Sequence, residues 1–513
     1  MFPVVLPPTA GLFDRPAELL EQASGHLYGG FLAWLLIAVG IWFTVRTRGL
    51  QFRLFGQMLR AIAGSRASSG GISSFQAFTI GLASRVGTGN IVGVALAITL
   101  GGPGAVFWMW VVALVGMATG FIESTLAQMY KIRHPEGTFR GGPAYYISRG
   151  LGSRRWAGVF AVVITFVFGF AYEATQANAI SGVMEGTFGV PPWGTAVALM
   201  ILATPVVVGG ISVVARIAEW MAPLMAGLYA LMAIVVLVLH AGAIPGALAG
   251  IVSGAFGADQ AVAGISGGFA AAALNGIKRG LFSNEAGEGS VPNAAATATV
   301  AHPVQQGLIQ SLGVFVDTIV VCTATAFVIL IAGPAAWTAP GANPSTLTTL
   351  AIAHGLGGWT VLPMAVLIFV LAYSSIIAAY VYTDVNMDYL TGGRRWASWT
   401  VRVVSVASAT AGAVLSLDVV WNAVDIAMAV MTLTNLVALV RLYRWGTGAL
   451  HDYEAQVRAG VAEPVFRGRD NPRLPGDVPG EVWSDDDGRA GAPSAPPAAP
   501  ADPPSSASTT AKD

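Results

Sequence analysis

The chain contains 513 residues, with 27 basic and 27 acidic side chains and a formal net charge of zero. Only 11% of its residues are charged and 54% are hydrophobic, whereas soluble globular proteins carry about 25% charged residues. This composition excludes a soluble enzyme and predicts an all-α polytopic membrane protein. The balanced charge gives no indication of a nucleic-acid partner, and the single cysteine, Cys322, excludes a disulfide within the chain.

Apolar runs of about 20 residues, the length of a membrane-crossing helix, mark the predicted spans. The chain does not begin with a basic segment and an apolar core, so we expect no cleaved signal peptide and interpret residues 1–26 as an extracytoplasmic segment. We expect Arg216 and Glu219 to separate two spans, and Asp418 to mark a tight turn before the last. The spans number about eleven: 27–46, 75–100, 104–130, 156–184, 194–213, 217–240, 266–298, 306–333, 360–384, 399–417 and 419–444.

Lysine and arginine are confined to every second predicted loop, which is the positive-inside pattern of multi-pass membrane proteins. The predicted outer loops, 241–265 and 334–359, contain neither residue. The pattern predicts a cell-membrane protein whose N-terminus lies outside and whose C-terminus lies in the cytoplasm. The basic residues of the predicted cytoplasmic loops are Arg46, Arg48, Arg53, Arg60, Arg66, Lys131, Arg133, Arg140, Arg149, Arg154, Arg155, Arg216, Arg394, Arg395, Arg441 and Arg444.

The composition changes after the last span. Residues 445–513 are rich in Pro, Ala, Asp and Ser and end in a run of prolines and alanines. Such a segment buries too little apolar surface to offset its conformational entropy. We therefore predict a disordered cytoplasmic tail over 445–513.

Two polar, glycine-rich stretches interrupt apolar spans, Gly87–Asn90 in the span 75–100 and Ser283–Ser290 in the span 266–298. If 27–46 is an extra N-terminal helix, ten spans remain, and each interrupted span opens one group of five. The groups cover residues 75–240 and 266–444, and the odd number of spans in each makes them inverted repeats with both breaks near the bilayer midplane. Close helix packing at glycine is the alternative interpretation.

A broken helix offers two kinds of backbone group to a ligand. A half-helix that starts at a break presents free N–H groups and a positive dipole end, which suit a carboxylate. A half-helix that ends there presents free carbonyls, which suit an ammonium group or a sodium ion. An amino-acid zwitterion together with Na⁺ would use both.

At these residues the chain resembles the sodium:alanine (alanine or glycine:cation) symporter family. The resemblance implies a leucine-transporter-type fold with a 5+5 inverted-repeat core, broken first and sixth core helices, and transport of alanine or glycine with Na⁺, or with H⁺ in some relatives. The chain departs from the family pattern at Ala378-Ala379, Thr383-Asp384 and Glu288. The matching stretches are Gly87–Val94, Gly101–Trp110, Glu123–Gln128, Arg140–Ile147, Arg279–Gly287, His302–Gly307 and Gly313–Thr318.

The candidate substrate-binding residues lie at the two breaks and on the third core helix. The backbone amides of the first break and an asparagine amide would bind the carboxylate of the substrate. A glutamine would bind it from the side or tie two helices together, and a phenylalanine would line the side-chain pocket or serve in packing alone. These candidates are Thr88, Gly89, Asn90, Gln176, Phe282 and Ser283.

The resemblance also implies a sodium site between the first and eighth core helices. Hydroxyls of Ser374 and Ser375 and backbone carbonyls of Arg85 and Val86 are the candidate ligands, since sodium prefers hard oxygen donors. The alternative is that both hydroxyls bond back to their own helix.

The apolar spans contain several charges, which are expensive unless they are paired. We consider an ion pair of Glu285 with Arg85 or Lys278 as a gate. Proton coupling through Glu123, Glu173 or Glu285 is the alternative to sodium coupling.

The sequence thus predicts a transporter and not an enzyme, because it shows no catalytic or metal-binding cluster. The predicted function is sodium-coupled symport of a small neutral amino acid, alanine or glycine, into the cell. The predicted partners are that amino acid, Na⁺ and the lipid bilayer, with no cofactor other than Na⁺ as the coupling ion.

Overall fold

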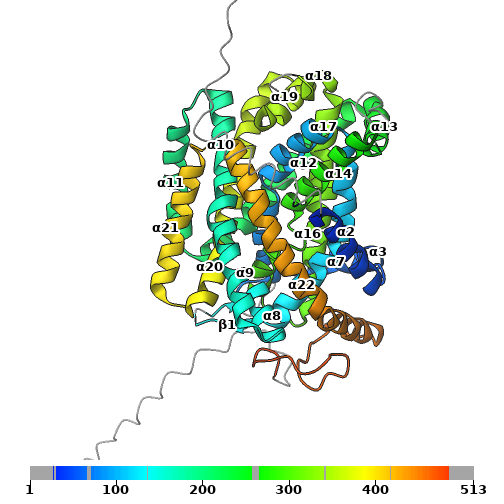
Figure 1. The fold of residues 1–513 in the computed structure, drawn as a ribbon, viewed down its shortest axis with the longest axis vertical. Helices are drawn as coiled ribbons and strands as arrows, with labels where there is room; N and C mark the ends of the chain where they lie inside the picture. Colours follow the sequence, from blue (N-terminus) through cyan, green and yellow to red (C-terminus); the bar gives the residue numbers. More distant parts are fainter. Residues whose placement is uncertain are drawn as a thin grey trace, which may run out of the picture.

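The computed structural model describes residues 27, 31–65, 71–135, 137–256, 265–339, 343–415 and 417–484. Helices pack side by side into one bundle (Figure 1). The described strands are β1 (Ile132–Arg133) and β2 (Phe139–Arg140), which form a short antiparallel hairpin at the end of the bundle that also carries α8 (Pro143–Gly150). The chain is an all-α polytopic membrane protein, as its composition predicts.

Six helical runs of the described residues are long and apolar enough to cross a membrane, and a bent pair makes a seventh candidate. The predicted number of eleven stays a prediction, because several other apolar helices are shorter. The six runs are Gly104–Met129, Arg154–Phe188, Ile211–Leu239, Pro303–Ile331, Gly358–Thr391 and Val424–Arg458, and the bent pair is Ser74–Arg85 with Gly89–Gly101.

The first predicted repeat begins with the bent pair and ends with a long helix. Its broken helix consists of α5 (Ser74–Arg85), the π-helical turn η2 (Gly89–Gly93) and α6 (Val94–Gly101). A capping box fixes the start of α5, since Ser73 and Gln76 exchange side-chain and backbone hydrogen bonds. The remaining elements of this half are α7 (Gly104–Met129), α9 (Arg154–Phe166), η3 (Val167–Tyr172), α10 (Glu173–Phe188), α11 (Pro192–Val208) and α12 (Ile211–Leu239).

The second half also opens with an interrupted helix, α14 (Ile265–Asn284) followed by α15 (Val291–Thr297). The long helices of this half are α16 (Pro303–Val314), η5 (Phe315–Cys322), α17 (Thr323–Ile331), α20 (Val361–Thr391), α21 (Arg395–Gly412) and α22 (Leu417–Arg458). Short elements outside these are α2 (Ala33–Arg46), α3 (Leu50–Arg53), α4 (Phe55–Ala63), η4 (Ala241–Ala243), α13 (Ile244–Ala255), α18 (Pro334–Trp337), α19 (Pro344–Leu356) and η6 (Gly358–Thr360).

Two predicted helix boundaries are wrong. The chain turns at Gly210, which has φ +75°, so α12 runs unbroken through Arg216 and Glu219. The carboxylate of Glu219 has a hydrogen-bond partner within the bundle, because its Oε2 accepts a hydrogen bond of 2.9 Å from Gln76 Nε2. The chain turns at 413–415 after α21, and Asp418 belongs to α22.

The prediction of a disordered tail from residue 445 is wrong for its described part. Helix α22 continues to Arg458, and residues 459–484 fold back over the end of the bundle that carries α8 (Figure 1). We call this segment the C-terminal strap. Phe466 and Trp483 are buried, the Trp483 indole donates to Gln128 O over 3.0 Å, and Phe466 N donates to Ala301 O. Residues 1–26 and 485–513 lie outside the described part of the chain.

Lys131 joins the strap to the second broken helix. Its Nζ donates to Ala298 O over 2.7 Å and lies 4.0 Å and 5.1 Å from the ring centroids of Phe139 and Trp483. Burial lowers the pKa of the Lys131 ammonium well below its usual value, and the charge of Arg133 adds to the shift. Aromatic faces therefore supply part of the stabilisation that this cation loses on leaving water.

Truncation after Arg458 should destabilise the protein, whereas truncation after Ser484 should leave the melting temperature of the purified protein nearly unchanged. The first removes Phe466 and Trp483 from a buried contact, and losing a buried Trp alone costs roughly 3–5 kcal/mol. The melting temperatures of the two truncated proteins are measured in the same detergent, with intrinsic fluorescence and size-exclusion chromatography as the readouts of unfolding. Equal melting temperatures for the two truncations would contradict a stabilising strap.

Candidate functional site

The first break lies between α5 and η2, where the helix axis bends by 46°. Val86 ends α5 with φ −79° and ψ +79°, values outside the helical region. The two N–H groups that follow are bound by side chains. Gly87 N donates to Asn90 Oδ1 over 3.0 Å, and Thr88 N donates to Gln176 Oε1, on α10, over 3.1 Å. Side chains thus replace the lost helical hydrogen bonds.

The second break occupies residues 285–290. Three of its residues have left-handed backbone, Glu285 at φ +54°, Gly287 at +89° and Gly289 at +85°. Gly287 N donates to Glu123 Oε1 over 3.2 Å, and Gly287 O accepts from Asn435 Nδ2 over 2.9 Å. Glycine adopts such angles without the steric penalty that other residues pay, which explains the two glycines, whereas Glu285 bears that penalty.

The two breaks touch each other. A Cβ on Gly89 would lie 3.0 Å from Phe282 Cδ1 and 3.2 Å from Ser283 Cα, so only glycine fits between the two helices. Asn90 Nδ2 donates to Ser283 Oγ over 3.1 Å. Phe282 in turn packs against Tyr172, at 5.3 Å between ring centroids. The structure therefore brings all six predicted substrate-binding residues to one place.

Asn90 has a different function in this structure from the predicted one. Its Oδ1 accepts from Gly87 N, and its Nδ2 contacts Ser283 Oγ and, at 2.6 Å, Asp317 Oδ1. Both ends of the amide are occupied by protein groups. Asn90 thus ties the break together and has no free donor for a substrate carboxylate.

Unsatisfied donors lie beside it instead. Thr88 Oγ1 and Gln176 Nε2 are buried and have no hydrogen-bond partner in the described part of the chain. The hydrogen bond from Thr88 N to Gln176 Oε1 keeps both residues at the first break. A buried donor without a partner costs about 1–3 kcal/mol, which an anionic ligand would recover.

Asp317 belongs to the site, although the sequence marked it only as a buried charge. It lies on η5, and its carboxylate accepts from Ser283 Oγ over 2.7 Å and Thr318 Oγ1 over 2.8 Å, in addition to Asn90. Asp317 therefore connects the first break to the second. An aspartate in an otherwise apolar run was the available signal, but its partners come from distant helices.

Glu285 makes a second connection between the breaks. Its Oε1 accepts from Ser84 Oγ over 2.6 Å, and its Oε2 accepts from Ser290 Oγ over 2.5 Å. The hypothesis of a gate that pairs Glu285 with Arg85 or Lys278 is not supported. Arg85 Nη1 donates to Gln310 O over 3.2 Å, and Lys278 Nζ lies 2.8 Å from Asp425 Oδ2.

The two serines predicted to bind sodium face the end of α5. Ser375 Oγ lies 2.9 Å from Ala83 O and 3.0 Å from Ser84 O, and Ser374 Oγ lies 3.2 Å from Ala83 O. Both hydroxyls also contact Leu371 O on their own helix. The carbonyls of Ala83 and Ser84 were missed from the sequence. No hydrogen bond joins either hydroxyl to the carbonyls of Arg85 or Val86, so those two ligands stay predictions.

Comparison with known proteins identifies the family. The profile of the sodium:alanine symporter family matches residues 14–468. The chain belongs to the sodium:alanine symporter family. The amino-acid carrier protein AlsT of Bacillus subtilis is 44% identical over 89% of this chain and 95% of its own length. The probable sodium/glutamine symporter GlnT of the same organism is 42% identical over 88% and 94%.

An archaeal relative and a solved structure agree with this assignment. The sodium/alanine symporter AgcS of Methanococcus maripaludis is 36% identical over 83% of this chain and 94% of its own. The crystal structure of MhsT in complex with L-phenylalanine superposes with a TM-score of 0.54, covering 74% of this chain and 90% of that one at 16% identity. The fold is therefore of the leucine-transporter type, with discontinuous first and sixth core helices.

Family membership defines the class of protein. Sodium:alanine symporters are multi-pass membrane transporters and not enzymes, and they move an amino acid together with a cation. The described residues contain no group of three or more His, Cys, Asp and Glu side chains that could hold a metal ion.

Gly87→Ala should abolish transport, whereas Gly93→Ala in the same broken helix should leave it within about twofold of the wild type. A Cβ at Gly87 would lie 2.2 Å from Ser375 Oγ and 3.1 Å from Gln176 Oε1, so it would displace both. A Cβ at Gly93 would meet nothing closer than Thr88 O at 3.9 Å. Uptake of labelled alanine into proteoliposomes, normalised to folded protein, measures the difference. Equal activity of the two variants would show that α20 and α10 do not approach the break this closely.

Proposed function

We propose that this symporter carries a small neutral amino acid, alanine or glycine, into the cell together with Na⁺. In this proposal the protein lies in the cell membrane with the α8 end of the bundle in the cytoplasm. The observation that carries the proposal is the contact of Ser374 and Ser375 with the carbonyls that end α5.

Sodium coupling is supported by the chemistry of this contact. Each serine has one hydroxyl proton, yet Ser375 Oγ alone lies within 3.3 Å of three carbonyl oxygens. At most one of these carbonyls receives that proton at a time. A sodium ion would accept lone pairs from the serine oxygens and from Ala83 O and Ser84 O together, since hard oxygen donors suit a hard cation.

Substrate binding is supported by the donors at the first break. Thr88 Oγ1 and Gln176 Nε2 would donate to the carboxylate of the amino acid, and the start of η2 adds its dipole. Phe282, held by Tyr172 and Gly89, would limit the size of the substrate side chain. Ser283 would lie near the ammonium end, beside Asp317.

Coupling of the two fluxes follows from shared residues. Ser84 contributes its carbonyl to Ser375 and its hydroxyl to Glu285 of the second break. An ion that fixes the end of α5 would therefore also fix the groups that bind the amino acid. By thermodynamic linkage, the amino acid would raise the affinity for the ion by the same factor.

Alanine uptake into proteoliposomes should follow an inward Na⁺ gradient and fail with a pH gradient alone. Ser375→Ala should raise the half-saturating Na⁺ concentration by about tenfold or more, as expected when one oxygen ligand is lost. Thr383→Ala is the matched control, because this hydroxyl on the same helix binds Ala379 O, one turn away in α20. Uptake driven by a pH gradient without Na⁺ would replace the sodium assignment with proton coupling through Glu123, Glu173 or Glu285.

Gln176→Leu should weaken alanine binding by about tenfold or more, because it removes a buried donor to the carboxylate. Thr88→Val should act in the same direction. Competition of labelled alanine uptake by L- and D-amino acids of increasing size, measured at saturating Na⁺, gives both the affinity and the substrate range. Asn178→Leu, also on α10, is the control, since its amide donates to Leu415 O. Unchanged affinity in Gln176→Leu would place the carboxylate elsewhere.

A further inference from the structure

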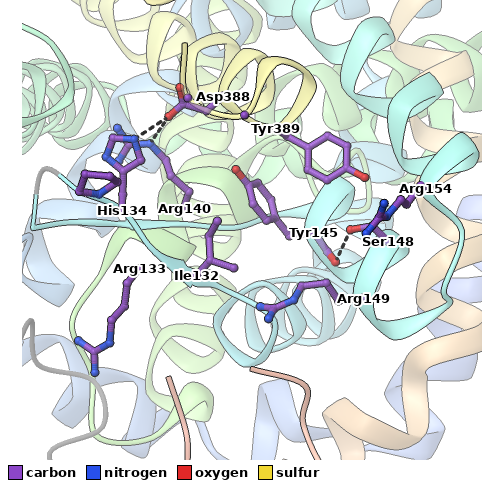
Figure 2. A pocket seen from close by; sticks show the side chains of 13 residues that line it. Ile132, Arg133, His134, Arg140, Tyr145, Ser148, Arg149, Arg154, Asp388 and Tyr389 are labelled. Atoms are coloured by element: carbon purple, nitrogen blue, oxygen red, sulfur yellow. Dashed lines mark hydrogen bonds and ion pairs between the residues drawn. The ribbon is translucent and has the colours of Figure 1, made fainter. Parts of the chain in front are cut away.

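A cavity of about 510 Å³ opens at the α8 end of the bundle, and its described lining residues belong to neither break. Its walls come from the β1–β2 hairpin, from α8, from the first residue of α9, from the last turns of α20 and from the loop between α20 and α21. Figure 2 shows Tyr145 in the middle of this group, with His134, Arg140 and Asp388 on one side and Arg149, Ser148 and Arg154 on the other. None of these residues is among those proposed to bind the amino acid or the sodium ion.

The lining is strongly cationic. Arg133, Arg140, Arg149 and Arg154 line the cavity with His134, and Asp388 is the acidic residue among the described lining residues. The cavity therefore favours an anion.

The one lining carboxylate is already bound. Asp388 Oδ2 lies 3.0 Å from Arg140 Nε and 3.3 Å from His134 Nε2. These contacts fix the wall made by α20 and β2. Because Asp388 is held by Arg140 and His134, the described lining residues include no other carboxylate that could neutralise the arginines of the opposite wall.

That opposite wall carries Arg149 and Arg154. No acidic side chain of the described residues lies within 4.0 Å of either guanidinium. Arg149 Nη1 donates to the carbonyls of Tyr130 and Lys131, both at 3.3 Å, which orients the guanidinium without neutralising it. Partial burial lowers the pKa of Arg149, and the neighbouring Tyr145 opposes that shift. Hydroxyls of Tyr145, Ser148 and Tyr389 line the space between the cations.

The position of the cavity relative to lipid comes from the aromatic residues beside it. Gly392 and Gly393, which line the cavity, lead directly into α21, whose first turns expose Trp396 and Trp399 by 58% and 54%. Exposed tryptophans of a membrane protein gather at the level of the lipid headgroups. The cavity thus lies where phosphate groups of the bilayer are available.

We propose that this cavity binds a phosphate-bearing anion and that in the membrane this anion is the headgroup of an anionic phospholipid. Arginine guanidinium groups bind phosphate through paired, charge-assisted hydrogen bonds. Basic pockets at the membrane surface, between helices, are suited to such headgroups. A bound headgroup would bridge α8 and α9 to the end of α20.

The test uses the full-length, delipidated protein in detergent and measures lipid binding by native mass spectrometry. Phosphatidylglycerol should bind more tightly than phosphatidylcholine with the same acyl chains. Arg149→Gln/Arg154→Gln should reduce phosphatidylglycerol binding by about tenfold or more. The matched control, Arg394→Gln/Arg395→Gln, removes two exposed arginines of the neighbouring loop that do not line the cavity, and it should change binding by less than about twofold.

Equal losses of phosphatidylglycerol binding in the two double variants would overturn the proposal, because they would show that the lipid is attracted only by the overall positive charge of this surface. Equal binding of the two lipids would also overturn it. Inorganic phosphate or glycerol 3-phosphate that displaces phosphatidylglycerol at millimolar concentration would overturn the headgroup assignment in favour of a soluble anion. Arg154→Gln alone, at an exposed helix start, provides a variant whose fold does not depend on the changed residue, and it should show part of the loss.

Discussion

Unwound backbone inside a membrane must find its hydrogen bonds within the protein, and this constraint organises the core of the transporter. At the first break the partners are the amides of Asn90 and Gln176. At the second break they are Glu123 and Asn435, which bind the N–H and the carbonyl of Gly287. The partners come from α7, α10 and α22 as well as from the broken helices. Packing of the whole bundle therefore decides whether either break can exist.

The π-helical turns are part of the same arrangement. The extra residue in η3 precedes α10 and places Tyr172 against both Ser84 O, at 2.7 Å, and the ring of Phe282. The turn η5 places Asp317 against Asn90 and Ser283. A π-helical turn shifts the register of a helix and often occurs at functional sites. Here each turn directs one polar side chain toward the junction of the two breaks.

The sequence predicted the features that depend on local composition and not those that depend on tertiary contacts. Glycine and polar residues in apolar runs located both breaks, composition gave the all-α membrane class, and the family resemblance implied the leucine-transporter-type fold. Charge was a poor guide to partners. Glu285 binds the hydroxyls of Ser84 and Ser290 instead of Arg85, because nearby hydroxyls satisfy a buried carboxylate without a second desolvated charge. The helix boundary expected at Arg216 and Glu219 failed for a related reason: Gln76 of α5 binds Glu219, so the charge does not end the helix.

Glu288 is a buried acidic residue whose carboxyl group lacks, among the described residues, the hydrogen-bond partners that its acidic neighbours have. Both of its carboxylate oxygens are buried without a hydrogen-bond partner in the described part of the chain, whereas Glu285 and Glu123 have partners. An ionised carboxylate without partners is too costly to bury next to two other acidic groups, so Glu288 is best accommodated in its neutral form. The hydrogen-bond donors of the second break instead serve the carboxyl groups of Glu285 and Glu123. Because Ser84 binds both Glu285 and Ser375, hydrogen bonds connect the second break to the carbonyls at the end of α5. In the proposed function, a cation at those carbonyls would act through the same hydrogen bonds on the residues proposed to bind the amino acid.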